Sequence, residues 1–393
     1  MRTLVAIALL TSTVLAQTYP LPLVASRDVA WPNTTGQGSP TLFTRVFYPS
    51  TVQGHNAPVL PNKGGWPVLL FLHGWSFMGR DYPTLCVEWA RQGFIVVAPD
   101  TGIWNYVTLS HDAHANLGAI AVANATANGP FHGAFDLSRI GVAGHSMGGG
   151  TMAFVVAQNP QIRCAFGFAP AAPVGNAATA ITVPIGCVVG DGDMLTPYWQ
   201  HAQPYLAGVS ASSPIKFMVR LDAHADHFSI AGMSGATSDF TRSSDISVGF
   251  FRHFLDVDVD ALEQCLGPSV LADPQVVAIE QDIAHPRIWA AGALVPGATA
   301  RVSVAAESGD GIIIAGPTAT LGVPTILGTL LLDPSQAFTW IVSVVPDVDR
   351  LDAYIHVPNT SAVVGMEFAL QPAAPTSSAS MRLGSIKEFV VGR

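Results

Sequence analysis

The stretch that decides the fold is Ile140-Gly-Val-Ala-Gly-His-Ser-Met-Gly-Gly-Gly150, an apolar run that leads into the pattern Gly-x-Ser146-x-Gly. The apolar residues at 140–143 predict a buried strand, and 147–158 predict the helix that follows. A serine between such a strand and helix lies on a sharp turn, where its hydroxyl stands above the sheet and the flanking glycines let the two backbones approach. The motif therefore indicates a nucleophilic serine at the end of a strand.

Short apolar runs alternate with longer helical stretches on both sides of this motif, from about residue 41 to residue 254. Such alternation predicts an α/β fold, with a doubly wound, mostly parallel sheet covered by helices. The apolar runs are continuous, which indicates that both faces of the sheet are buried. We expect strands at 68–72, 94–98, 140–143, 164–168, 185–189 and 217–221, and helices at 83–92, 147–158 and 246–255.

Beyond about Ile288 the pattern changes to short strands separated by glycine, proline and aspartate. Regular short strands with turn residues between them favour a small all-β, sandwich-like domain. We therefore predict a signal peptide over 1–16, a catalytic domain over 17–266, a linker over 267–287 and an all-β accessory domain over 288–393.

The composition excludes several classes of protein. Hydrophobic residues make up 49% of the 393 residues and charged residues only 11%, which is the opposite of the balance found in disordered chains. The chain carries 18 basic and 27 acidic residues, for a net charge of −9. Electrostatic binding to nucleic acid is therefore not expected. The oligomeric state stays open.

The N-terminus has the features of a secretory signal peptide: Arg2, an apolar run over 4–10, and a possible cleavage site after Ala16. The alternative is a buried N-terminal helix. Elsewhere no apolar run reaches the roughly 18 to 20 residues that a membrane-spanning helix needs, so we expect an exported protein, secreted or periplasmic. The chain has four cysteines, for which disulfide pairing and burial as free thiols both stay open: Cys86, Cys164, Cys187 and Cys265.

A serine nucleophile needs two N–H donors to stabilise the oxyanion that forms on its substrate. We expect one donor from the backbone of Met147, which follows the nucleophile at a helix N-terminus. The second is expected from the turn His73-Gly-Trp75 after the strand at 68–72, and we assign it to the Trp75 N–H. His73 is expected to order that turn.

The catalytic acid and the histidine should follow the serine in that order along the chain. The loop after the strand at 185–189 offers Asp191 and Asp193 as the acid. The loop after the strand at 217–221 offers His224 and His227, of which His227 precedes an aromatic residue at the apex of the loop. Asp222-Ala-His-Ala-Asp-His227 also resembles a dinuclear zinc motif, but its first position is Asp rather than His, so we expect no metal and no cofactor.

These motifs resemble those of α/β-hydrolases, in the branch of the dienelactone hydrolases and chlorophyllases. Over residues 41–266 the chain is similar to bacterial cutinase-like polyester hydrolases, including those that cleave poly(ethylene terephthalate), on the residues 144–150, Asp193 with Pro197, and His227 with Phe228. The resemblance implies that Ser146 is the nucleophile, Asp193 the acid and His227 the base. It also implies an oxyanion hole formed by the backbones of Trp75 and Met147.

Two departures from the family pattern bear on the substrate. Polyester hydrolases carry a tryptophan after the proline that follows the next strand, whereas Pro170 is here followed by Ala171. Chlorophyllases usually have arginine after the nucleophile, where this chain has Met147. Six aromatic residues are candidates for the walls of the cleft, and each could equally belong to the core: Trp75, Phe77, Trp104, Tyr106, Tyr198 and Phe228.

The sequence thus predicts a secreted serine ester hydrolase that acts on neutral or hydrophobic esters, including insoluble polyesters, through an acyl-enzyme. One alternative is a non-catalytic binding or adhesion protein on a degenerate hydrolase scaffold, in which the β domain does the binding. The other is a serine peptidase or amidase.

Overall fold

The computed structural model describes residues 21–284, 286–306, 309–325, 328–332, 338–345, 350–360, 363–375, 381–383 and 386–392. The predicted signal peptide over 1–16 lies outside these residues. Among the described residues, no helix combines the length and the hydropathy that crossing a membrane requires.

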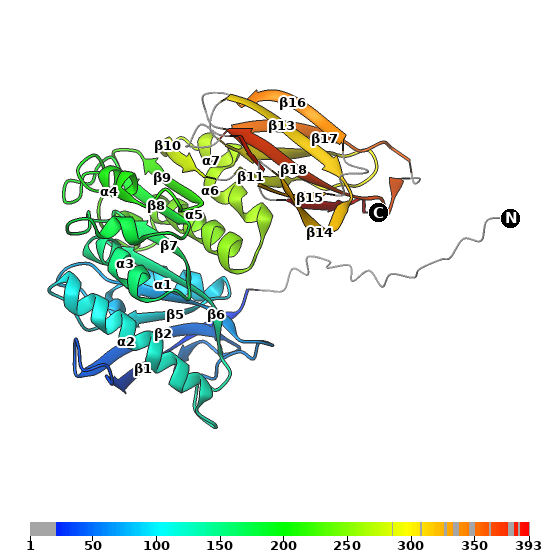
Figure 1. Cartoon of the computed structure of the whole chain (residues 1–393). Helices are drawn as coiled ribbons and strands as arrows, with labels where there is room; N and C mark the ends of the chain where they lie inside the picture. Colours follow the sequence, from blue (N-terminus) through cyan, green and yellow to red (C-terminus); the bar gives the residue numbers. More distant parts are fainter. Residues whose placement is uncertain are drawn as a thin grey trace.

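A ten-stranded sheet forms the centre of the larger part of the chain, in the order β10-β9-β8-β7-β6-β4-β5-β2-β1-β3 (Figure 1). The strands from β5 across to β9 run parallel, and β2 and β10 pair antiparallel at the two sides of this parallel block. This is the mostly parallel sheet that the sequence predicts. The strands are β1 (Leu23–Pro32), β2 (Thr41–Ser50), β3 (Gly54–His55), β4 (Trp66–Leu72), β5 (Ile95–Pro99), β6 (Phe135–His145), β7 (Ile162–Phe168), β8 (Ile185–Gly190), β9 (Ile215–Leu221) and β10 (Val276–Ile283).

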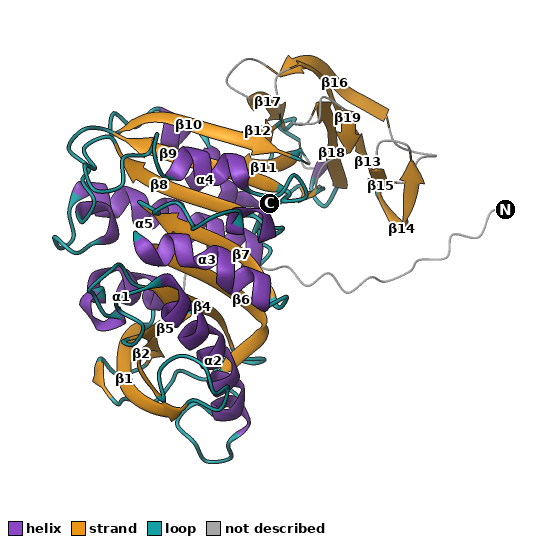
Figure 2. Ribbon diagram, turned by 60° about the vertical axis from the view of Figure 1, so that its left-hand side comes forward, coloured by secondary structure: helices purple, strands orange, loops and turns teal. Residues whose placement is uncertain are grey.

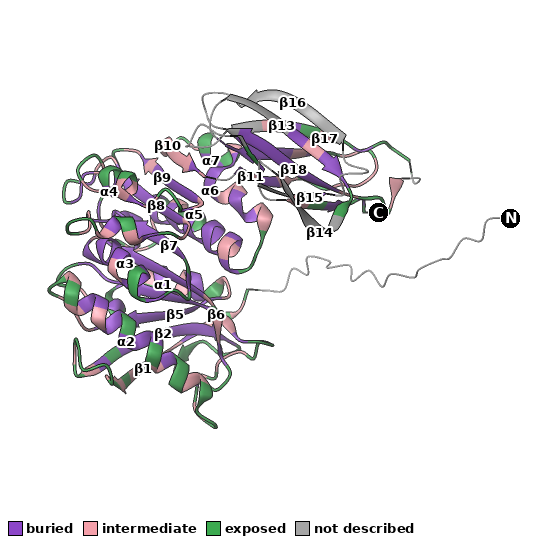
Figure 3. Ribbon diagram, in the orientation of Figure 1, coloured by how far each residue is buried: buried purple, intermediate pink, exposed green. Residues whose placement is uncertain are grey.

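Helices cover both faces of this sheet (Figure 2). Alternate residues of β4 point to opposite faces: Leu69 packs with α1 and α5, and Leu70 packs with α2 and α3. Both faces of the central strands are therefore buried, as their continuous apolar runs predict (Figure 3). The helices are α1 (Pro83–Arg91), α2 (Tyr106–Ala125), α3 (Met147–Gln158), α4 (Ala202–Gly208), α5 (Ser238–Leu255), α6 (Glu263–Leu266) and α7 (Pro268–Leu271).

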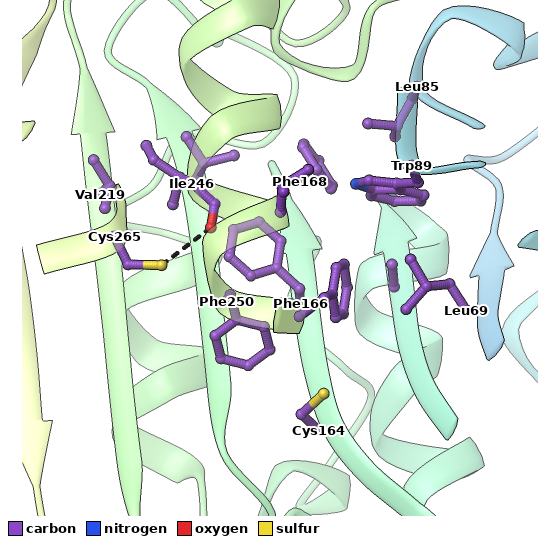
Figure 4. Packing of buried hydrophobic residues seen from close by; sticks show 14 of the residues in the cluster. Leu69, Leu85, Trp89, Cys164, Phe166, Phe168, Val219, Ile246, Phe250 and Cys265 are labelled. Carbon is purple, nitrogen blue, oxygen red and sulfur yellow. Dashed lines mark hydrogen bonds between the residues drawn. The ribbon is translucent and has the colours of Figure 1, made fainter. Parts of the chain in front are cut away.

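The core on the α1 and α5 face is rich in aromatic rings, with Phe166 lying between the sheet and Phe250 of α5 (Figure 4). Cys86, Cys164 and Cys265 belong to this packing, and Cys187 lies in a smaller cluster that includes Ala202 of α4. All four are buried free thiols, and the Cys265 thiol donates a hydrogen bond to the Ile246 carbonyl oxygen at 3.1 Å. Burial raises the pKa of each thiol above its ordinary value. Of the two alternatives, the structure supports burial of the cysteines as free thiols and not disulfide pairing.

The C-terminal part of the chain consists of antiparallel sheets with a separate hydrophobic core. One sheet has the order β11-β12-β17, another has β16-β13-β18-β19 with β20 beside β18, and β14 pairs with β15. Small antiparallel sheets are the architecture that the turn-rich pattern predicts. These strands are β11 (Arg287–Ala291), β12 (Thr299–Ala305), β13 (Gly309–Gly316), β14 (Thr318–Thr325), β15 (Gly328–Leu332), β16 (Phe338–Val345), β17 (Arg350–His356), β18 (Glu367–Pro375), β19 (Met381–Leu383) and β20 (Lys387–Val390).

The segment 267–287, expected as a linker, differs from that expectation. It contains α7 and β10. Strand β10 pairs with β9, with one register shift between Val276 and Ala278, so it is the last strand of the large sheet. The sequence pattern does not reveal β10, because an edge strand is only partly buried and carries charged residues such as Glu280 and Asp282. The division into a catalytic domain over 17–266 and an accessory domain over 288–393 stays a prediction.

An acidic segment after α5 makes side-chain contacts with the C-terminal part of the chain. It comprises η4 (Val259–Leu262) and α6. Glu263 accepts hydrogen bonds from the Trp289 indole N–H, at 2.8 Å, and from Arg301. Asp260 accepts one from the Lys387 ammonium group at 2.7 Å. The Trp289 side chain is fully buried in the core of the large sheet. Packing and polar contacts together therefore fix β11 against the part of the chain that contains the large sheet.

Replacing Glu263 with alanine is expected to destabilise the protein by about 2 kcal/mol, because the buried Trp289 N–H then lacks an acceptor. Urea unfolding followed by tryptophan fluorescence measures this loss. Glu88→Ala is the matched control. Among the described residues, the Glu88 side chain bonds to its neighbours Arg91 and Gln92 at the surface of α1, and the substitution should cost at most about 0.5 kcal/mol. An equal loss of unfolding free energy in the two variants would show that the hydrogen bond between Glu263 and Trp289 does not stabilise this contact.

Candidate active site

Ser146 lies on the turn between β6 and α3, at the carboxyl edge of the parallel strands. Its backbone φ of 53° is in the left-handed region, which is strained for a residue with a side chain. The turn needs glycine on both sides. A Cβ atom at Gly144 would lie 2.4 Å from the Gly148 carbonyl carbon, and one at Gly148 would lie 2.0 Å from the Leu72 carbonyl oxygen. The Gly-x-Ser-x-Gly pattern is thus a steric requirement of this turn.

The backbone of Ser146 is held by the last residue of β7 and by the loop that follows it. The Ser146 N–H donates to the Phe168 carbonyl oxygen at 3.0 Å, and the Ala171 N–H donates to the Ser146 carbonyl oxygen at 2.9 Å. The Ser146 side chain itself stays partly exposed. The strained turn therefore has a fixed position, and Ser146 as a residue is partly exposed.

Asp193 and His227 meet on the same edge of the sheet, from the loops after β8 and β9. The Nδ1 atom of His227 lies 2.7 Å from the Asp193 Oδ2 atom, and both side chains are buried. Burial alone would raise the pKa of Asp193, but the hydrogen bonds from His227 and Thr196 outweigh it and lower that pKa to about 2. Asp193 is therefore a carboxylate at neutral pH and can orient the imidazole of His227.

Thr196 is a supporting residue that the sequence reasoning missed. Its hydroxyl donates to Asp193 Oδ2 at 2.8 Å, and its backbone N–H and that of Leu195 donate to Asp193 Oδ1 at 2.9 and 2.8 Å. A local signal was present, because the side chain of an aspartate in a turn commonly accepts a bond from the backbone N–H group two residues later. These bonds fix the carboxylate that faces His227.

The rival residues lie elsewhere. Asp191 forms a two-point ion pair with Arg220. The side chain of His224 is 90% exposed and lies beside Asp222. The structure thus brings Asp193 and His227 together, and it does not bring Asp191 or His224 into that pair. Within the part of the chain that is described, no three His, Cys, Asp or Glu side chains converge in a way that could hold a metal ion.

The turn His73-Gly-Trp75 lies directly beside the serine. A Cβ atom at Gly74 would stand 3.4 Å from the Ser146 Cβ atom. The ring of His73 bridges the carbonyl oxygens of Gly74 and Thr101, at 2.9 Å each, so it orders the turn as expected. Met147 is the first residue of α3, and the first N–H groups of a helix have no acceptor within the helix. Both predicted oxyanion donors therefore belong to segments that adjoin Ser146.

The six aromatic candidates differ in what their rings contact. Trp75 and Trp104 are 58% and 60% exposed, and their rings meet edge to face with centroids 5.5 Å apart. Phe228 packs on the His227 ring, with Phe77 at its other side. Tyr106 packs against Phe154 of α3, and Tyr198 lies under the Arg220 guanidinium group.

Other exposed apolar side chains lie in the loops at the same sheet edge, and the sequence reasoning did not single them out. They are Val174 after β7, and Met194, Leu195 and Trp199 after β8. Exposed apolar side chains grouped on one edge are typical of a surface that contacts an apolar partner or substrate. Together with Trp75 and Trp104, they give the edge that bears Ser146 an apolar character.

Part of the chain is similar to known proteins. Residues 44–275 match the family model described as PET hydrolase-like. A bis(hydroxyethyl) terephthalate hydrolase of Streptomyces coelicolor is 26% identical over 245 residues, which are 62% of this chain and 71% of that protein. Cutinase 1 of Thermobifida cellulosilytica is 30% identical over 180 residues, and cutinase est1 of Thermobifida alba is 28% identical over 182.

Each cutinase alignment covers 46% of this chain, and the chain spans 65% and 57% of the two cutinases' own lengths. The C-terminal β-rich part, beyond residue 275, lies outside the family match. The family match covers more than half of the 393 residues, and it contains the strands and loops that carry Ser146, Asp193 and His227. We conclude that the chain belongs to the PET hydrolase-like family, and that it is an α/β-hydrolase of the carboxylic ester hydrolase class.

Proposed function

We propose that this protein is a secreted serine esterase that hydrolyses neutral, hydrophobic esters, polyesters among them, with Ser146 as nucleophile, His227 as base and Asp193 as acid. The observation that carries the proposal is the buried hydrogen bond between His227 and Asp193 at the sheet edge that bears the strained Ser146. Secretion is supported by the N-terminal sequence, with its Arg2, apolar run and small residues near Ala16.

In the proposed mechanism His227 first takes the proton of the Ser146 hydroxyl, which attacks the ester carbonyl carbon. The His227 Nδ1–H donates to Asp193, so Nε2 is the ring nitrogen that has a lone pair for this proton. The imidazolium then gives the proton to the leaving alcohol, and an acyl-Ser146 ester remains. Water, activated by His227, hydrolyses this ester and releases the acid.

The negative charge that develops on the carbonyl oxygen needs donors that are already in place. The N–H groups of Trp75 and Met147 would supply them. The positive end of the α3 dipole also lies at Met147 and favours this charge. Neither donor needs a large movement, because the turn at Gly74 and the turn at Ser146 are in contact.

The proposed substrate class follows from the chemistry of the edge that surrounds Ser146. Six exposed side chains in the loops at this edge are apolar, and a chain with a net charge of −9 does not favour a polyanionic substrate. The relatives are named for terephthalate ester hydrolysis and for cutin hydrolysis. Ala171 leaves the loop after β7 without an aromatic ring at that position, so Trp75 and Trp104 are the proposed aromatic contacts.

Trp104→Ala is expected to raise KM for bis(hydroxyethyl) terephthalate about 3- to 10-fold with little change in kcat, because an aromatic contact contributes about 0.5 to 1.5 kcal/mol to binding. Steady-state kinetics measure the change, and p-nitrophenyl acetate is the internal control, since its acyl group has no ring. An equal change in KM for both esters would show that Trp104 does not recognise the aromatic acid.

The test of the proposed function is covalent labelling combined with a substrate panel. A fluorophosphonate should add once, to Ser146, as peptide mass spectrometry can show. The panel runs from acetyl to long-chain esters, then to an amide and to polyester film, with the acid released as the readout and Ser146→Ala as the blank. A label on another residue, or hydrolysis confined to the amide, would overturn the proposal.

A further inference from the structure

A hydrogen-bonded chain of buried groups runs beneath the candidate active site through Tyr82 and His145, whose side chains are fully buried. The Tyr82 oxygen lies 3.0 Å from the Gly74 nitrogen and 2.8 Å from the His145 Nδ1 atom. The Nε2 atom of His145 lies 2.8 Å from the His227 carbonyl oxygen. Tyr82 and His145, which we call the Tyr–His link, therefore join three separate loops.

The donors in this chain follow from elimination. A carbonyl oxygen only accepts, so the His145 Nε2 atom must carry the hydrogen that bonds to His227. In the neutral ring Nδ1 is then the acceptor, and the Tyr82 hydroxyl donates to it. The Gly74 N–H donates to the Tyr82 oxygen. Each of the three contacts thus has one donor and one acceptor.

Both groups stay neutral over the pH range in which esterases are assayed. Burial, together with the nearby His227, lowers the pKa of His145 to about 3. Burial raises the pKa of Tyr82 above its ordinary value. The link therefore has no proton to exchange with His227 at these pH values, and what it can transmit is position.

Each end of the link adjoins a group that the proposed mechanism uses. Gly74 precedes Trp75, the proposed oxyanion donor, and His145 precedes Ser146. The third contact is the backbone of the base, His227. The rings are also packed, because the His145 centroid is 4.5 Å from that of His227 and the Tyr82 centroid is 4.8 Å from that of Phe71.

We propose that Tyr82 and His145 are positioning residues, which hold the oxyanion turn, the nucleophile turn and the base loop in one geometry for acyl transfer. This inference rests on the proposed function of Ser146 and His227. It accounts for a fully buried tyrosine and histidine that the mechanism itself does not use, since a buried polar pair costs desolvation unless every group in it is bonded.

The first test is Tyr82→Phe, which removes one hydroxyl and keeps the ring. We expect kcat for p-nitrophenyl butyrate to fall about 10- to 100-fold, the usual result of a small misplacement of reacting groups, with KM within about twofold. The matched control is Tyr48→Phe. Tyr48 is also fully buried, and its hydroxyl donates to the Ala57 carbonyl oxygen at 2.8 Å, so this variant loses a similar bond in β2, outside the link.

The second test compares two replacements of His145. Glutamine can accept from Tyr82 and donate to His227, whereas leucine can do neither. We expect His145→Gln to keep a kcat about tenfold above that of His145→Leu. Because these two variants do not depend on the folding of Tyr82→Phe, they decide the question if that variant is unstable.

Outcomes that overturn the inference are distinct from those that overturn the proposed function. If Tyr82→Phe retains the wild-type kcat, or if its loss matches that of Tyr48→Phe at an equal fall in Tm, the link has only a structural role. Equal kcat for the two His145 variants has the same meaning. If Ser146→Ala stays active, the proposed function itself fails, whatever the Tyr82 and His145 variants do.

Discussion

Replacing Ser146 with alanine is expected to lower kcat for p-nitrophenyl butyrate by about 10⁵- to 10⁶-fold, the loss typical of a serine hydrolase without its nucleophile. No acyl-enzyme can form, and the residual rate would come from direct attack of water on the ester carbonyl, whose developing negative charge the oxyanion donors still stabilise. The fold should survive, because the turn at Ser146 is held by backbone hydrogen bonds from Ser146 to Phe168 and from Ala171 to Ser146. An alanine at position 146 keeps both bonds.

The control for this variant is Ser210→Ala, since Ser210 is a surface residue that bonds within its own loop. It should change kcat less than twofold, within the usual range of silent surface substitutions. Circular dichroism and the urea midpoint establish that both variants are folded. Residual activity above about 1% in Ser146→Ala, with no wild-type contamination, would mean that another group is the nucleophile.

Asp193→Asn is expected to lower kcat by about 10⁴-fold, with KM nearly unchanged. The carboxylate accepts the His227 Nδ1–H, and an asparagine amide can instead donate to Nδ1, which moves the ring proton to Nε2 and removes the base. With the pKa of Asp193 lowered to about 2, the wild-type carboxylate stays ionised at every usual assay pH, so substitution is the way to remove its charge.

Asp191→Asn is the matched control for Asp193→Asn. The two aspartates are two residues apart, but Asp191 pairs with Arg220, and its substitution should change kcat less than about threefold. Should Asp191→Asn lose as much activity as Asp193→Asn, the acid would not be Asp193 alone. Equal KM values for wild type and Asp193→Asn would indicate that the loss lies in the chemical step.

The sequence predicted the α/β fold and most of the central strands, because buried parallel strands are continuous apolar runs with turn residues between them. Helix α3 begins and ends at Met147 and Gln158, as predicted. The sequence did not reveal α2 or β10. Helix α2 buries many small and polar residues, such as Ala113 and Asn116, which dilute the helical periodicity of its apolar face.

The candidate site was predictable to the extent that it depends on local pattern. The turn between β6 and α3 needs glycine on both sides of Ser146 for steric reasons, and that requirement is visible in the sequence. The choice of Asp193 over Asp191 and of His227 over His224 rested on resemblance to a family, since spacing alone left both pairs open. The turn signal at Asp193 did not identify the Thr196 hydroxyl as its partner, and an exposed tryptophan such as Trp199 has no periodic signature.

The sequence by itself determined the nucleophile turn, the alternation of strands and helices, and the change of pattern near residue 288, because each depends on neighbours within one element. Only the tertiary structure decided which distant residues meet. His227 lies 34 residues from Asp193, and Tyr82 lies 63 residues from His145. Such contacts depend on the order of strands in the sheet and on how the loops at its carboxyl edge pack, and no local pattern records either.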